Sequence, residues 1–180
     1  MAEQRVLRMG DPELRRVSDP VSRFDDSLVD LIQDMWDTMA ARGGVGIAAP
    51  QIGVPLRVVV FEVANSERYP EAPPVPRTVL INPEIEFTDD EVTEGWEGCL
   101  SVPGLRGVVP RHRRLRYRGL DAEARPFERE AEEFHARVVQ HECDHLDGIL
   151  YPQRMKDLST LAFEDELNLV QRLAEVAVEV

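Results

Sequence analysis

The stretch Gln140-His141-Glu142-Cys143-Asp144-His145 decides most of what this sequence predicts. On an α-helix, residues four apart lie on one face, so His141 and His145 would present two imidazoles side by side. Glu142 would lie next to them. This is a His-Glu-x-x-His arrangement, in which two nitrogen atoms bind a divalent metal and a carboxylate serves the metal-bound water. The alternative, two ordinary histidines, leaves the position of Glu142 unexplained.

A catalytic metal site also needs a third protein ligand and an open coordination position. The best candidate is Cys99, in a Gly-Cys-Leu-Ser setting that suits a tight, partly buried loop. A nucleophile and a bystander are the other interpretations of this thiol. A closed structural site would recruit Cys143 as well. Cys143 would lie about 200° round the helix from His141, so we expect a buried core residue instead.

Composition limits the remaining possibilities. The chain has 180 residues, enough for one domain with a core and short for two, so residues 1–180 are expected to form a single catalytic domain. With 34 acidic against 21 basic residues, the formal net charge is −13, which disfavours nucleic-acid or anionic-membrane binding. Two cysteines make no disulfide framework, and neither a secretory leader nor a membrane span is recognisable. A cytoplasmic location is expected.

The first half of the chain predicts an extended arm, one helix and two strands. The helix begins at Asp25 or Asp26 and ends at Gly43-Gly44. Apolar residues at helical spacing indicate core packing rather than a cofactor site: Leu28, Leu31, Ile32, Met35, Trp36 and Met39. Runs of β-branched residues predict strands at 57–63 and 78–82, the second ending at Pro83.

Alternation of arginine with apolar residues predicts a strand at 113–120 that turns back into a second strand at 126–129. The arginines could form a nucleic-acid patch, but acids surround them, and a solvated face with salt bridges is the better interpretation. They are Arg111, Arg113, Arg114, Arg116 and Arg118.

The metal helix is expected to begin near Ala131 and to end at Gly148. Phe134 and Val138 fall on the histidine face, which indicates a buried helix and a sheltered metal. A last amphipathic helix is expected from about Leu161 to Ala177, so that 161–180 form a helical tail. The predicted fold class is α+β, with antiparallel sheets around the metal helix and a helix near each end.

Three segments together resemble the bacterial-type peptide deformylases. They are Gly44-Val45-Gly46-Ile47-Ala48-Ala49-Pro50-Gln51, Glu97-Gly98-Cys99-Leu100-Ser101 and His141-Glu142-Cys143-Asp144-His145. The similarity extends to about Pro152. It implies that Cys99, His141 and His145 bind one divalent metal. Ferrous iron is the expected ion, with zinc, nickel and cobalt as alternatives. It also implies removal of the formyl group from N-formyl-methionine of new polypeptides.

The resemblance also implies a role for each remaining site residue. Water activated by the metal would attack the formyl carbon, with Glu142 as general base and then general acid. The Gln51 amide and the Leu100 N–H would stabilise the oxyanion. The backbone at Val45 and Gly46 would pair with the substrate as an added strand. The peptide pocket would further contain Gly98, Arg106, Phe134 and Val138.

Some features match only part of the family, and two rival functions need weighing. Trp96 and the proline-rich loop at 69–76 are such features. The tail from Phe163 is acidic, with Arg172 its only cation, so any ribosome contact should be transient and independent of a basic tail. A non-catalytic protein that recognises formylated N-termini would lack Glu142 or Gln51. A zinc endopeptidase usually has its third ligand after the helix, whereas Cys99 precedes it.

Overall fold

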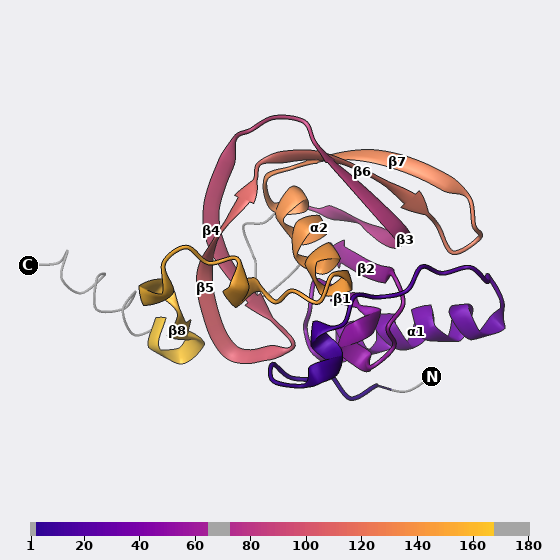
Figure 1. Cartoon of the computed structure of the whole chain (residues 1–180), viewed down its shortest axis with the longest axis horizontal. Coiled ribbons are helices and arrows are strands. Elements are labelled where there is room, and N and C mark those ends of the chain that lie inside the picture. Colours follow the sequence, from indigo (N-terminus) through magenta and orange to yellow (C-terminus); the bar gives the residue numbers. More distant parts are fainter. Residues whose placement is uncertain (1–2, 65–72, 168–180) are drawn as a thin grey trace, which may run out of the picture.

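The computed structural model describes residues 3–64 and 73–167, and it confirms the α+β prediction. Figure 1 shows helix α2 (Glu133–Leu146), which carries the His-Glu-x-x-His motif, between two antiparallel sheets. One sheet has the order β1-β2-β3-β6-β7 and the other the order β4-β5-β8. The strands are β1 (Gly46–Ala48), β2 (Val58–Val63), β3 (Val75–Phe87), β4 (Val92–Cys99), β5 (Val102–His112), β6 (Arg114–Leu120), β7 (Pro126–Glu132) and β8 (Ala162–Phe163). Single 3-10 turns occur at Pro12–Arg15, Ala49–Ile52, Tyr151–Gln153 and Leu158–Thr160.

Strand β2 is buried on both faces and joins the two largest parts of the core. Val59 and Phe61 pack in the cluster that contains the apolar side of α2. Val58 and Val60 point the other way, into the cluster formed with α1 (Asp26–Ala41). Because side chains alternate along a strand, one β-branched run serves both layers. The predicted apolar stripe of α1 is confirmed as core packing.

Strand β3 is longer than predicted, because Pro83 does not end it. Asn82 adopts a positive φ of 51° and the register with β6 shifts between Ile81 and Glu84, which is a β-bulge. The Asn82 side chain fixes the bulge by accepting from the N–H of Val21 and donating to its carbonyl, both at 2.8 Å. A proline is tolerated at such a point because no ladder hydrogen bond from its nitrogen is required.

The hairpin β4–β5 was not predicted, and Cys99 lies at the end of β4 rather than in an isolated loop. Glycine, proline and charged residues weaken the strand pattern of both segments. The hairpin β6–β7 is confirmed and extends to Glu132, so α2 begins at Glu133, two residues later than expected. Gly148 follows the helix with φ 72°, as predicted for its end.

The segment after α2 returns to the smaller sheet. Strand β8 pairs with β5 at Leu105↔Phe163 and Arg106↔Ala162, so the helix expected from Leu161 does not start there. Residues 164–167 are helical, and the remainder of the expected tail, 168–180, lies outside the described residues, as does most of the proline-rich loop. In the described part of the chain, no helix is long and apolar enough to cross a membrane.

Candidate metal centre

The three predicted metal ligands meet where β4 ends beside α2. The sulfur of Cys99 and one ring nitrogen each of His141 and His145 all lie within 4.8 Å of one another. The Cys99 Sγ is 3.3 Å from Nε2 of His145, and these two residues are 5% and 2% exposed. One thiolate and two imidazoles suit zinc, iron, nickel or cobalt. Three protein ligands leave a coordination position for a reactant, as catalytic sites do.

Neighbouring charges favour a cation at this position. Burial alone would lower the pKa of His141, but the thiol of Cys99 and the carboxylate of Glu97 raise this pKa well above its usual value. The Nδ1 of His141 donates to Oε2 of Glu97 over 2.8 Å, which leaves Nε2 as the ligand atom. Burial holds the pKa of His145 well below its usual value, so its ring is neutral, the form that binds metals.

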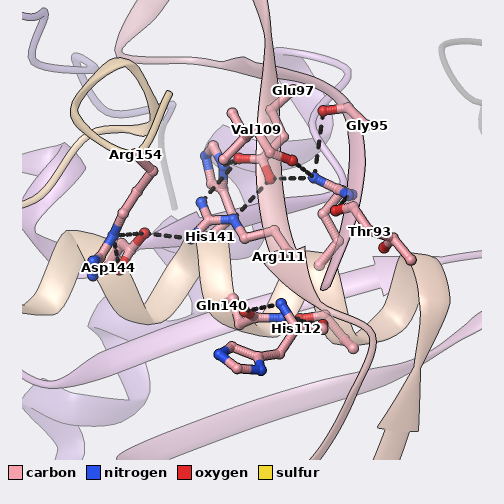
Figure 2. A network of polar contacts seen from close by, with 12 residues as sticks. Thr93, Gly95, Glu97, Val109, Arg111, His112, Gln140, His141, Asp144 and Arg154 are labelled. Atoms are coloured by element: carbon pink, nitrogen blue, oxygen red, sulfur yellow. Dashed lines mark hydrogen bonds and ion pairs between the residues drawn. The ribbon is translucent and has the colours of Figure 1, made fainter. Parts of the chain in front are cut away.

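A buried ion-pair network holds Glu97 (Figure 2). Burial would raise the pKa of Glu97, but the hydrogen bonds from Arg111 and His141 keep it well below the usual range. Arg111 donates Nε and Nη2 to the two carboxylate oxygens at 2.8 and 2.9 Å, and its Nη1 reaches Asp144 at 2.5 Å. Arg154 donates to the other Asp144 oxygen at 2.6 Å. The connected ion pairs from Arg154 through Asp144 and Arg111 to Glu97 therefore fix the orientation of the His141 ring.

The position of Arg111 corrects one prediction. Arg111 is 5% exposed and belongs to this network, not to a solvated face. The salt-bridged surface is confirmed for the other four arginines. They are Arg113 with Glu91 and Glu133, Arg114 with Asp89, Arg116 with Glu130, and Arg118 with Glu84.

The carboxylate of Glu142 is placed to exchange a proton. It is 4% exposed, and its Oε2 has no hydrogen-bond partner among the described residues. Burial raises the pKa of Glu142 to about 7, which suits a group that takes and returns a proton near neutrality. A Cβ at Gly46 would overlap this carboxylate, so the absence of a side chain at Gly46 makes room for it.

Gln51 presents a fixed N–H donor to the same place. Its Oε1 accepts from the N–H of Ala48 at 2.8 Å, which turns Nε2 towards Ser101 Oγ at 3.1 Å and Cys99 Sγ at 3.5 Å. At 1% exposed, the side chain has no room for another orientation. Leu100, whose backbone N–H is the other expected donor, follows Cys99 directly.

Most of the predicted site residues line one cleft. It is formed by Gly44, Val45, Gly46, Gln51, Trp96, Glu97, Gly98, Cys99, Leu100, Phe134, Arg137, Val138, His141 and Glu142. Arg106 is not among them, and its guanidinium pairs with Glu164 at 2.7 Å. Cys143 packs in the core with Val139 and Leu146, and burial raises the pKa of its thiol.

Sequence reasoning missed the polar support of this centre. Glu97 lies two residues before Cys99, so strand alternation places both on one face of β4. Arg137 lies four residues before His141 and therefore on the histidine side of α2. Both spacings are present in the sequence. Their significance depends on the β4–β5 hairpin, which was not predicted from the sequence.

The fold and the site together define a metal-dependent hydrolase, with a metal helix, a thiolate ligand from a hairpin and a buried carboxylate beside a cleft. The family model described as polypeptide deformylase matches residues 3–160. The chain belongs to the polypeptide deformylase family, whose members remove the N-terminal formyl group from nascent polypeptides.

Individual relatives agree with this assignment. Peptide deformylase 1 of Bordetella pertussis is 59% identical over 163 residues, which cover 90% of this chain and 93% of that protein. Peptide deformylase 2 of Ralstonia nicotianae is 60% identical over the same length, covering 90% and 92%. Among solved structures, the Met-Ala-Ser-bound class I type b enzyme of Acinetobacter baumannii has a TM-score of 0.82 at 40% identity, covering 86% of this chain and 99% of that one. Peptide deformylase from Thermotoga maritima has a TM-score of 0.78 at 38% identity, covering 87% and 100%.

Proposed function

We propose that Cys99, His141 and His145 hold one divalent ion, ferrous iron in the cell, with zinc, nickel or cobalt able to replace it. The observation that carries the proposal is Glu142, which lines the same cleft as Cys99 and His141 and whose buried Oε2 has no hydrogen-bond partner in the part of the chain that the structure describes. Such an ion supplies a Lewis acid that acidifies water and polarises a carbonyl group. The substrate is a polypeptide that begins with N-formyl-methionine.

Glu142 moves the proton during the reaction. It takes a proton from the water that adds to the formyl carbon, and it passes this proton to the methionine nitrogen as the C–N bond breaks. The products are formate and a peptide with a free amino terminus. A carboxyl group with a pKa of about 7 can perform both transfers near neutral pH.

Gln51 and Leu100 stabilise the negative charge that develops on the formyl oxygen. The Gln51 Nε2 is aimed at the Cys99 side of the cleft by the bond between its Oε1 and Ala48. The backbone N–H of Leu100 is the second donor. Donors fixed before the reaction need no reorganisation when charge develops, which is why they lower the barrier.

The peptide chain lies along β1. This strand is at the edge of the larger sheet, so its outer side can pair with a substrate strand through Val45 and Gly46. Phe134 and Val138 take the methionine side chain, and Gly98 leaves space for the backbone. The Acinetobacter baumannii relative was solved with Met-Ala-Ser bound, which supports a peptide that begins with methionine as the ligand. A contact with Arg106 would require its pair with Glu164 to open.

The proposed cellular location follows from the nature of the substrate. New polypeptides emerge in the cytoplasm, where residues 1–180 would act as one catalytic domain. Any ribosome contact would be transient and would not use the acidic residues after Phe163.

Anaerobic purification with elemental analysis tests the metal, and formate release from formyl-Met-Ala-Ser tests the reaction. We expect one equivalent of iron and turnover of the formylated peptide, with no cleavage of internal peptide bonds. Binding of formylated peptide without formate release would support the non-catalytic rival, and internal cleavage would support the endopeptidase.

A further inference from the structure

We propose that Arg137 is a positioning residue that fixes the spacing of the metal ligands by locking the β4–β5 hairpin to α2. The inference rests on the proposed metal centre. The ligands come from two separate elements, because Cys99 ends β4 whereas His141 and His145 lie on α2. Their mutual distances therefore depend on how firmly the hairpin is held against the helix.

The guanidinium of Arg137 bonds both strands of the hairpin at once. Its Nη2 donates to the carbonyl oxygen of Thr93 at 2.9 Å, and its Nη1 donates to the carbonyl of Val109 at 2.8 Å. The same Nη1 is 3.4 Å from the carbonyl of Gly95. Figure 2 labels the three residues that supply these carbonyls, Thr93, Gly95 and Val109, in the same polar network as Glu97. A planar guanidinium has donors enough to satisfy several fixed acceptors together, which an aliphatic side chain could not do.

Arg137 also acts directly on the carboxylate that orients a ligand. Its Nη1 donates to Oε1 of Glu97 at 2.9 Å, while Oε2 of Glu97 accepts from His141. Arg137 precedes His141 by four residues, so both side chains lie on one side of α2. Both side chains are 11% exposed and that of Glu97 is 4% exposed, so water competes little for these bonds.

A second observation shows that this position is built around the guanidinium. A Cβ at Gly95 would lie 2.9 Å from both Cζ and Nη2 of Arg137. Any other residue at 95 would push the guanidinium away from its acceptors. Gly95 thus gives an independent way to disturb Arg137 without removing its charge.

The test measures metal affinity of the full chain by competition with a chromogenic chelator, using Zn²⁺ and Co²⁺. The variants are Arg137→Met, Arg137→Lys and Gly95→Ala, with Arg116→Met as the matched control on the exposed face of β6. Outer partners of metal-binding histidines typically contribute about 10- to 100-fold in affinity, and we expect a loss in this range for Arg137→Met. Arg137→Lys should restore part of it, Gly95→Ala should show a smaller loss in the same direction, and Arg116→Met should bind as the wild type does.

Two further readouts separate positioning from other roles. The Co²⁺ thiolate absorption band should shift or weaken in Arg137→Met, because the sulfur and the imidazoles are no longer held at fixed spacing. Metal affinity within fivefold of wild type in Arg137→Met and Gly95→Ala would overturn the proposal. A raised KM with unchanged affinity would overturn it too, by making Arg137 a substrate contact. If Arg137→Met does not fold, the metal affinities of Arg137→Lys and Gly95→Ala decide whether Arg137 positions the ligands.

Cys99→Ser shows which proposal has failed. If Cys99→Ser loses the metal but Arg137→Met keeps it, the metal centre stands and the role of Arg137 is wrong. If Cys99→Ser also keeps the metal, the ligand assignment itself is wrong.

Discussion

Glu97 and Cys99 lie two residues apart on β4, and together they contact both histidines of α2. The Glu97 carboxylate accepts from Nδ1 of His141, and the Cys99 sulfur lies 3.3 Å from Nε2 of His145. Because alternate residues of a strand share a face, β4 presents the orienting carboxylate and the thiolate on the same buried side. The centre is therefore as rigid as the contact between the hairpin and the helix.

The Glu142→Gln variant should keep its metal and lose most of its turnover. The three ligands are unchanged, but an amide cannot carry the proton from water to the leaving amine, and such a step is worth roughly 10²- to 10⁴-fold in rate. Elemental analysis and kcat for formyl-Met-Ala-Ser measure the two effects. A kcat close to that of the wild type, with metal still bound, would show that another group transfers the proton.

The two cysteines should differ in alkylation. Cys99 should be protected while the metal is bound and should react once a chelator removes it, since the thiolate is the ligand. Cys143 is 7% exposed in the core, so it should stay unreactive in both forms of the folded protein. Mass spectrometry after labelling reports both sites, and metal-dependent protection of Cys143 in place of Cys99 would contradict the assignment.

Cys143→Ala is the matched variant for Cys99→Ala. It should retain metal and activity, and it should lower the free energy of unfolding by about 1 kcal/mol, as for a trimmed core residue. Cys99→Ala should lose the metal, because two imidazoles alone make a poor site. Equal loss of metal from both variants would mean that the thiols do not have separate roles.

The sequence was sufficient for the metal helix, because two histidines four apart with Glu142 between them already specify a face and a chemistry. It was also sufficient for α1, β2 and the β6–β7 hairpin, whose apolar periodicities are clear. The hairpin β4–β5 was missed because its strands carry Gly95, Gly98 and Pro103, which are poor strand formers. Its pairing depends on contacts with α2 that no local pattern contains.

The supporting charges were missed for a related reason. Arg111 belongs to a run of arginines that looks like a solvated face, and only the packing of β5 against α2 shows that its side chain is buried with Glu97 and Asp144. The resemblance predicts Arg106 in the peptide pocket, and nothing in the sequence indicates its ion pair with Glu164, which directly follows β8. Partners that are distant in sequence are set by tertiary structure, which neither periodicity nor motif spacing reports.

His135 should make the protein less stable in acid. Burial and the nearby Arg129 lower the pKa of His135 from 6.5 to about 4 in the folded state. The unfolded chain binds this proton more readily than the folded protein does. The contribution of neutral His135 to the free energy of unfolding is therefore fully present above about pH 6.5, and it is lost as pH falls towards 4. The upper limit of the loss is about 3 kcal/mol, because one pKa unit corresponds to about 1.4 kcal/mol.

His135→Gln isolates this contribution, because glutamine does not titrate and can still bond the Tyr117 hydroxyl, which lies 3.2 Å from the His135 ring. Urea unfolding at pH 7 and pH 4 should show a smaller difference in unfolding free energy for the variant than for the wild type. Equal differences in the two proteins would mean that His135 does not titrate in this window.

Gly46→Ala should lower activity through Glu142 rather than through the backbone. The φ angle of Gly46 is not positive, so alanine introduces no backbone strain, but its Cβ would overlap the Glu142 carboxylate. Displacing a catalytic group by about 1 Å can cost on the order of 10²-fold in rate, and a loss of kcat of this size is expected with metal content unchanged.

Glu142→Asp provides the test of coupling between Gly46 and Glu142, because its carboxylate is withdrawn by one methylene. Adding Gly46→Ala to Glu142→Asp should therefore cost much less than adding it to the wild type, as interacting residues are not additive. Equal costs in both backgrounds would show that Gly46 acts elsewhere, for example on the pairing of the substrate with β1.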